Sequence, residues 1–186
     1  MNEGEADFLK PLDQVLIPDS RTLYNFPSAD DAFKAHYDLV SKIILNTHVH
    51  NDVKVQFETA KNAFVYSFFA YRLGMMSVYQ AIAATELALR RMIGDPNKKP
   101  KETFQPLLQK AHDMGLVDVK KIAPHMDIAG FKKFLGGFRN DLSHGSHTLM
   151  PPFAMAPIIR DCGNILNQLF ENAHTQSLKP SWNAWS

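Results

Sequence analysis

The feature that most constrains the fold is a long amphipathic pattern between Val53 and Met92. Residues of one stripe recur there in alternating steps of three and four, the spacing of one helix face. The stripe consists of Val53, Phe57, Ala60, Phe64, Phe68, Tyr71, Met75, Val78, Ile82, Thr85, Leu89 and Met92. A straight helix of about forty residues would be about 60 Å long, which exceeds the width of a domain of this size. The pattern therefore predicts helix with a bend or break near Asn62 or Gly74.

Helical spacing also recurs on both sides of this segment. It predicts a first helix over residues 29–46, a shorter one over 103–114 with Gly115 as its C-cap, and a last one over 153–173. Residues 116–126 resemble a turn or a helical stub. Because no segment shows sustained strand alternation, the predicted fold class is all-α, a single helical bundle of about five helices.

The ends of the chain differ in character from this bundle. Residues 1–27 contain three prolines among short apolar clusters, which predicts an extended N-terminal arm lying on the domain or on a partner. The helical domain is expected to span 28–174. The tail, 175–186, carries Trp182 and Trp185 and is either flexible or a docking peptide; the sequence does not decide between the two.

Composition limits the classes of protein that this chain can belong to. Apolar residues make up 45% of it, with 13 phenylalanines, which excludes a disordered chain. The formal net charge of +1 provides no general cationic field, so contact with nucleic acid would have to be local. With Cys162 as the single cysteine, and with neither an export signal nor a membrane span in the sequence, we expect a soluble cytoplasmic protein.

The richest chemistry lies in the twelve residues GGFRNDLSHGSH, from Gly136 to His147. If residues 128–144 are helical, an apolar stripe of Phe131, Phe134, Leu135, Phe138 and Leu142 faces the core. The opposite, outer face then contains Lys133, Asn140 and His144, flanked by Gly136 and Gly137.

The two glycines make a specific prediction about this outer face. Glycine inside a helix costs about 1 kcal/mol relative to alanine, so we expect close approach of a partner helix or an RNA backbone at Gly136 and Gly137. Asn140 and His144 are four residues apart, near enough for the amide to orient the imidazole. Arg139 lies on the shoulder of the helix, from which its long side chain reaches the same face.

Simpler interpretations compete with a functional one at several of these positions. His144 alone would be an ordinary surface histidine. The pairs His48/His50 and His144/His147 suggest a metal, but two ligands are too few without nearby cysteines or well-spaced acids, so we expect no metal or cofactor.

Two further features favour a structural interpretation. Glu86 and Arg90 are four residues apart, and an ordinary intrahelical ion pair is favoured over a catalytic role. Cys162 has no acid or base near it in the sequence and is most simply a small buried residue.

The segment Arg139-Asn-Asp-Leu-Ser-His144 matches the R-x4-6-H motif of the HEPN superfamily, which this chain resembles. The segments MSVYQAIAATELALRRMIG (76–94) and LLQKAHDMGLVD (107–118) are similar to helices that precede the motif in that superfamily. The similarity covers roughly residues 64–172, and the six-residue motif alone is weakly specific.

This resemblance implies a small helical domain with metal-independent endoribonuclease activity. In such enzymes two copies of the motif meet across a homodimer interface to form one composite cleft. They occur as toxins, in antiviral defence and in RNA-guided ribonucleases, so the implied partners are RNA, a second copy and an antitoxin or defence-system protein. Some members are inactive and only bind or dimerise, which leaves a binding or assembly module as the alternative; a metalloenzyme using the histidines ranks third.

The residue types suit RNA cleavage in which the 2'-hydroxyl attacks the adjacent phosphate. His144 can serve as acid or base because the pKa of histidine is ordinarily near 6.5. Arg139 offers a planar fork of donors for phosphate oxygens, and Asn140 would orient the histidine or the phosphate. Supporting or RNA-binding roles are assigned to Lys133, Ser143 and His147.

Overall fold

The computed structural model describes residues 8–26, 28–95, 102–143 and 149–178. These ranges contain eight α-helices and no strand, so the all-α class is confirmed, while the expected number of about five helices is too low. The helices are α1 (Ser20–Leu23), α2 (Ala29–Ser41), α3 (Asn51–Tyr66), α4 (Leu73–Ile93), α5 (Phe104–Asp113), α6 (Val119–Ile122), α7 (Ile128–Ser143) and α8 (Pro152–Thr175), and a short 3₁₀-helix, η2 (Leu12–Gln14), precedes them.

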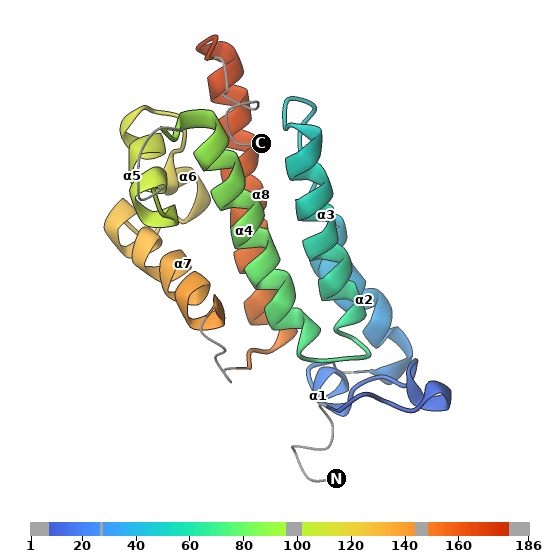
Figure 1. The fold of residues 1–186 in the computed structure, drawn as a ribbon. Coiled ribbons are helices and arrows are strands. Elements are labelled where there is room, and N and C mark those ends of the chain that lie inside the picture. The colour runs from blue at the N-terminus through green and yellow to red at the C-terminus, as the bar shows by residue number, and fades with distance from the viewer. Residues whose placement is uncertain (1–7, 27, 96–101, 144–148, 179–186) are drawn as a thin grey trace.

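The long amphipathic pattern folds into two helices that lie side by side as a hairpin (Figure 1). α3 ends at Tyr66 and α4 begins at Leu73, so the break lies next to Gly74, whereas Asn62 is inside α3. The turn keeps Phe68 and Tyr71 buried. The stripe therefore continues through the turn, which is why the periodicity alone does not locate the break.

Helix α4 occupies the centre of the molecule and packs against α3, α5, α7 and α8 (Figure 1). It is buried on several sides, with many small residues at its contacts; the buried residues include Ser77, Ala81, Ala84 and Ala88. At Gly74 a Cβ atom would lie 2.5 Å from Cε of Met155 on α8, so a larger residue would have to displace the end of this side chain. The arrangement makes α4 the scaffold on which the other helices are positioned.

Helix α8 closes the core against α4 and α2. Cys162 on this helix is fully buried, and burial raises the pKa of its thiol to about 12. The interpretation of Cys162 as a small buried residue is thus confirmed. α8 starts one residue before the expected range and ends two residues after it.

The remaining helix boundaries follow from local signals. α2 ends at Ser41 rather than at residue 46, and Asn46 instead bonds through its backbone N–H to Oδ1 of Asn167 on α8 at 2.8 Å. α5 ends at Asp113, one residue before the expected end, with Met114 as its C-cap. Gly115 then adopts a left-handed φ of 69°, and Leu116 N donates to the Ala111 carbonyl.

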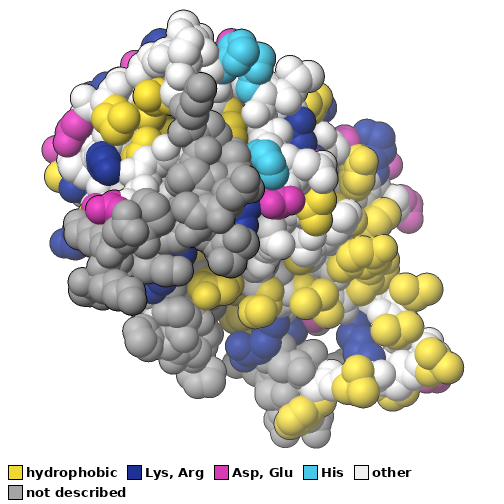
Figure 2. Space-filling view, turned by 45° about the horizontal axis from the view of Figure 1, so that its top comes forward, with side chains coloured by type: hydrophobic (Ala, Val, Ile, Leu, Met, Phe, Trp, Pro, Cys, Tyr) yellow, Lys and Arg dark blue, Asp and Glu magenta, His cyan; other side chains and the backbone are white. Residues whose placement is uncertain are grey.

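The N-terminal arm lies on the turn between α3 and α4. Lys10 Nζ donates to the Phe69 carbonyl at 2.7 Å, and Asp19 N donates to the Phe68 carbonyl at 2.9 Å. The arm is not simply extended, since residues 8–26 include η2 and α1. Its outer surface is apolar (Figure 2), with Phe8, Leu9, Leu12, Leu16, Ile17 and Tyr24 more than half exposed.

Two sequence-based expectations concern the ends of the chain and the membrane. The tail segment with Trp182 and Trp185 lies outside the described residues. Within the described ranges, every helix is too short or too polar to cross a membrane.

His36 of α2 fixes this helix to the end of α3. Its ring is fully buried and stacks on Phe64, with centroids 4.5 Å apart and planes at 3°. Nε2 lies 2.8 Å from the Phe64 carbonyl, and Nδ1 has no hydrogen-bond partner among the described residues. Burial lowers the pKa of His36, so the folded protein takes up a proton there at a lower pH than the unfolded chain does.

We expect this histidine to make folding sensitive to acid. The unfolded chain takes up a proton at His36 near pH 6.5 and the folded chain only at a lower pH, so its contribution to stability is full above pH 6.5 and is lost as the pH falls towards the lowered pKa of the folded state. In His36→Phe, urea denaturation at pH 7.5 and 5.5 should show a smaller decrease in the free energy of unfolding than in the wild type. An equal decrease in both proteins would contradict this account.

Candidate functional site

A buried carboxylate joins α4 to α7. Glu86 on α4 is only 7% exposed. Its Oε1 accepts a hydrogen bond from Arg90 Nη2 at 2.6 Å, and its Oε2 accepts one from Arg139 Nε at 3.2 Å. Arg90 lies one turn further along α4, whereas Arg139 comes from α7.

Burial explains why this carboxylate has two cationic partners. An ionised carboxyl group that leaves water loses several kcal/mol of solvation, and close ion pairs offset that loss. Two guanidinium groups around one carboxylate leave a net positive charge. Since the side chain of Arg139 is 34% exposed and that of Glu86 is 9% exposed, part of this charge lies at the surface, on Arg139.

Arg139 lines a hollow of about 390 Å³ between α5 and α7. The lining residues are Thr103, Phe104, Gln105, Pro106, Gly136, Arg139 and Asn140. Arg139 Nη1 makes a long contact of 3.4 Å with Asn140 Oδ1, and no described residue accepts a hydrogen bond from Nη2. Glu86 therefore holds the guanidinium through Nε, and the terminal nitrogens retain donors for a bound ligand.

The same hollow contains the N-terminus of α5. Thr103 is the N-cap of this helix, and its side chain makes no capping hydrogen bond. The backbone N–H groups of Phe104 and Gln105, the first two residues of α5, have no partner within the helix, whereas Pro106, the third residue, has no N–H. Together with the helix dipole these two groups attract anions. Arg139 and the start of α5 thus place two sources of positive potential around one hollow.

The expected orientation of α7 is confirmed for Phe131, Leu135, Lys133 and Asn140, whereas Gly136, expected beside the outer face, is buried against α5. Phe131 and Leu135 are fully buried, whereas Lys133, Asn140 and Asp141 are exposed. Helical periodicity is sufficient to predict this orientation. A helix that has the core on one side and solvent on the other buries its apolar stripe against the core.

The histidines of the motif cannot be placed in this geometry. His144 and His147 lie outside the described residues. Ser143 is the last residue of α7, and the described side chains of the helix end at Asp141. The site that the structure describes therefore consists of Arg139, Asn140 and their surroundings.

The close approach predicted at the two glycines occurs at one of them and comes from the same chain. A Cβ atom on Gly136 would meet the side chain of Gln105 on α5, and none of the described atoms lies within 4 Å of a Cβ on Gly137. The approach of a partner helix or an RNA backbone to this face stays a prediction. A helical wheel does not give the neighbour at Gly136, because it contains no information about the other helices of the same fold.

Glu86 is the residue whose role sequence reasoning missed. The expected pair with Arg90 is present, but it is buried and shared with Arg139. A signal existed, because Glu86 continues a row with Ile82 and Leu89 at steps of four and three. An acid within an apolar row predicts a buried carboxylate that needs a partner from elsewhere in the fold.

His48 and His50, the other histidine pair, make contacts within the fold. His50 Nδ1 accepts a hydrogen bond from Asp52 N at the start of α3, and the His48 ring stacks on His174 with centroids 4.2 Å apart. Within the described residues, no group of three histidine, cysteine or acidic side chains is arranged to hold a metal ion.

Comparisons with protein-family models, with curated proteins and with solved structures found no match. The site is therefore defined by its own geometry: a helical scaffold presents an arginine, held by a buried acid, beside a helix N-terminus. This combination is suited to binding a phosphate or another anion.

The two glycines provide a matched test of the packing around this site. Alanine at position 137 meets open space, so Gly137→Ala should raise the free energy of unfolding by up to about 1 kcal/mol through helix propensity. Alanine at position 136 must displace the Gln105 side chain, so Gly136→Ala should gain less or destabilise the protein. Urea denaturation of both variants measures the difference; equal gains would show that Gln105 does not pack against α7 as described.

Proposed function

We propose that this protein is a metal-independent endoribonuclease of the HEPN type. Arg139, Asn140 and His144 form its catalytic motif, and the 2'-hydroxyl of the substrate attacks the adjacent phosphate. The observation that carries the proposal is the anchoring of Arg139 by buried Glu86 beside the N-terminus of α5. The phosphate group of RNA carries a negative charge on two non-bridging oxygens. The paired N–H donors of an arginine guanidinium bind both of these oxygens.

The proposed chemistry assigns one task to each group. The guanidinium of Arg139 binds the non-bridging phosphate oxygens and stabilises the charge that develops on them. His144 takes the proton of the 2'-hydroxyl or protonates the departing 5'-oxygen, the tasks of a general base and a general acid. The new 2'-O–P bond and the broken P–O5' bond give a cyclic phosphate and a free 5'-hydroxyl. Asn140 orients the phosphate or the histidine, and Lys133 adds charge on the exposed face.

A second copy of the chain completes the proposed site. One subunit supplies a single motif, whereas acid and base catalysis of this reaction needs two proton-transferring groups. The open space at Gly137 lies on the helix face that carries exposed Lys133 and Asn140. A two-fold axis at this face would place the two copies of the motif opposite each other.

The alternative is a catalytically silent HEPN-like module that binds RNA or a partner protein, such as an antitoxin or a defence-system component. The exposed apolar surface of the N-terminal arm favours this alternative, since Leu9 and Tyr24 are 97% and 91% exposed. A group of exposed large apolar side chains commonly marks a protein-binding surface.

Incubating the purified protein with mixed RNA in excess EDTA tests the catalytic proposal. The wild type should cleave RNA and leave 2',3'-cyclic phosphate ends. His144→Ala and Arg139→Ala should each reduce the rate by about 10²-fold or more, because each removes a group that acts in the transition state. Arg160→Ala, which changes an exposed arginine of α8, serves as the control and should cleave at the wild-type rate.

The outcomes separate the candidate functions. Cleavage that EDTA abolishes would exclude the metal-free mechanism. A dimer that cleaves no RNA under any condition would favour the binding module.

A further inference from the structure

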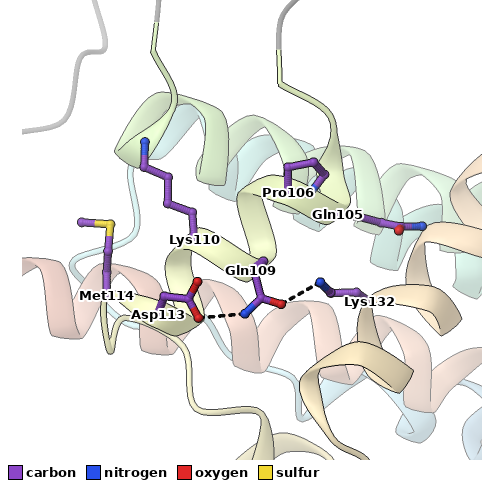
Figure 3. A pocket seen from close by; sticks show the side chains of 7 residues that line it. All are labelled: Gln105, Pro106, Gln109, Lys110, Asp113, Met114 and Lys132. Atoms are coloured by element: carbon purple, nitrogen blue, oxygen red, sulfur yellow. Dashed lines mark hydrogen bonds between the residues drawn. The ribbon is translucent and has the colours of Figure 1, made fainter.

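A second hollow, of about 550 Å³, adjoins the one that contains Arg139 (Figure 3). Its lining residues are Gln105, Pro106, Gln109, Lys110, Asp113, Met114 and Lys132. Gln105 and Pro106 line both hollows. The two hollows therefore lie next to each other along α5, and together we call them the α5 groove.

The groove extends the positive charge of the site. Lys132 lies seven residues before Arg139 on α7, two helical turns and about 10 Å away along the axis on the same side of the helix. Its Nζ donates to Gln109 Oε1 at 2.6 Å, and Gln109 Nε2 donates to Asp113 Oδ1 at 2.7 Å (Figure 3). These bonds hold Lys132 over the groove, and an ammonium group keeps further donors for an incoming anion.

The far end of the groove combines apolar and polar surface. Met114 is 39% exposed and lines the end of the hollow that is away from Pro106. The carboxylate of Asp113 lies between Met114 and Lys132 (Figure 3). An apolar surface next to hydrogen-bonding groups suits a nucleobase, which has flat faces and polar edges. Lys110 contributes a second ammonium group, which is held by the Ile93 carbonyl at 2.6 Å.

We propose that the α5 groove binds the nucleotide next to the one that is cleaved, with its phosphate on Lys132 and its base against Met114. Single-stranded RNA then runs along α5 from Arg139 to Met114. This inference rests on the proposed function and adds a substrate subsite to it. It assigns a binding role to residues outside the arginine–histidine motif.

The subsite is tested by binding, independently of cleavage. His144→Ala protein is titrated with a fluorescent 2'-O-methyl RNA octanucleotide, which cannot undergo 2'-hydroxyl attack, over a range of salt concentrations. Adding Lys132→Gln should weaken binding about 5- to 10-fold and reduce the slope of log K against log salt by about 0.7, the value for one phosphate contact on a single strand. Lys121→Gln, at an exposed lysine on α6, is the matched control and should change neither quantity.

Lys132→Gln also removes the hydrogen bond to Gln109, which could itself change the shape of the groove. A second variant controls for this effect. Met114→Glu places a negative charge at the far end of the groove without removing any recorded hydrogen bond, and it should weaken binding of the same RNA. Wild-type affinity in both Lys132→Gln and Met114→Glu would overturn the proposed subsite.

Cleavage by the wild-type protein separates this proposal from the function on which it rests. If RNA is cleaved while both groove variants bind like the wild type, the subsite is wrong and the proposed function stands. If the groove variants weaken binding but the wild type cleaves nothing, the groove stands and the catalytic proposal fails. Absence of both binding and cleavage overturns both.

Discussion

The candidate site depends on the burial of Glu86 between two arginines. A carboxylate with 7% exposure is tolerated at the contact between α4 and α7 because Arg90 and Arg139 each donate to one of its oxygens. The two arginines have different roles. Arg90 belongs to the same helix as Glu86 and compensates its charge locally, whereas Arg139 links two helices and is held at the edge of a hollow.

The position of α4 makes this anchor rigid. The helix packs against α3, α5, α7 and α8, and its small residues allow these neighbours to approach closely. The hollow that Arg139 lines is formed by the start of α5 and by residues 136–140 of α7. Both helices pack against α4 and against each other. The geometry around Arg139 is thus set by the core of the bundle, which preorganises the site.

Sequence patterns predicted the features that depend on a single helix, and missed those that depend on two. The period of the apolar residues is enough to predict α7 and to separate buried Phe131 from exposed Asn140. The contact of Gln105 with Gly136 joins residues from two helices, and so does the bond between Glu86 and Arg139. Such contacts are set by how helices pack, and local periodicity contains no information about the neighbour that a given face will meet.

The central claim is that Glu86 acts through Arg139, and a double-mutant cycle on the rate of the proposed RNA cleavage tests it most directly. The rates of Glu86→Gln, Arg139→Ala and the combined variant are compared with the wild type, and the free energy of unfolding of each protein is measured in parallel. If Glu86 positions Arg139, Glu86→Gln slows cleavage in the wild-type background and has little further effect once Arg139 is alanine. Full activity in Glu86→Gln, or independent and multiplicative losses from the two substitutions, would contradict the account.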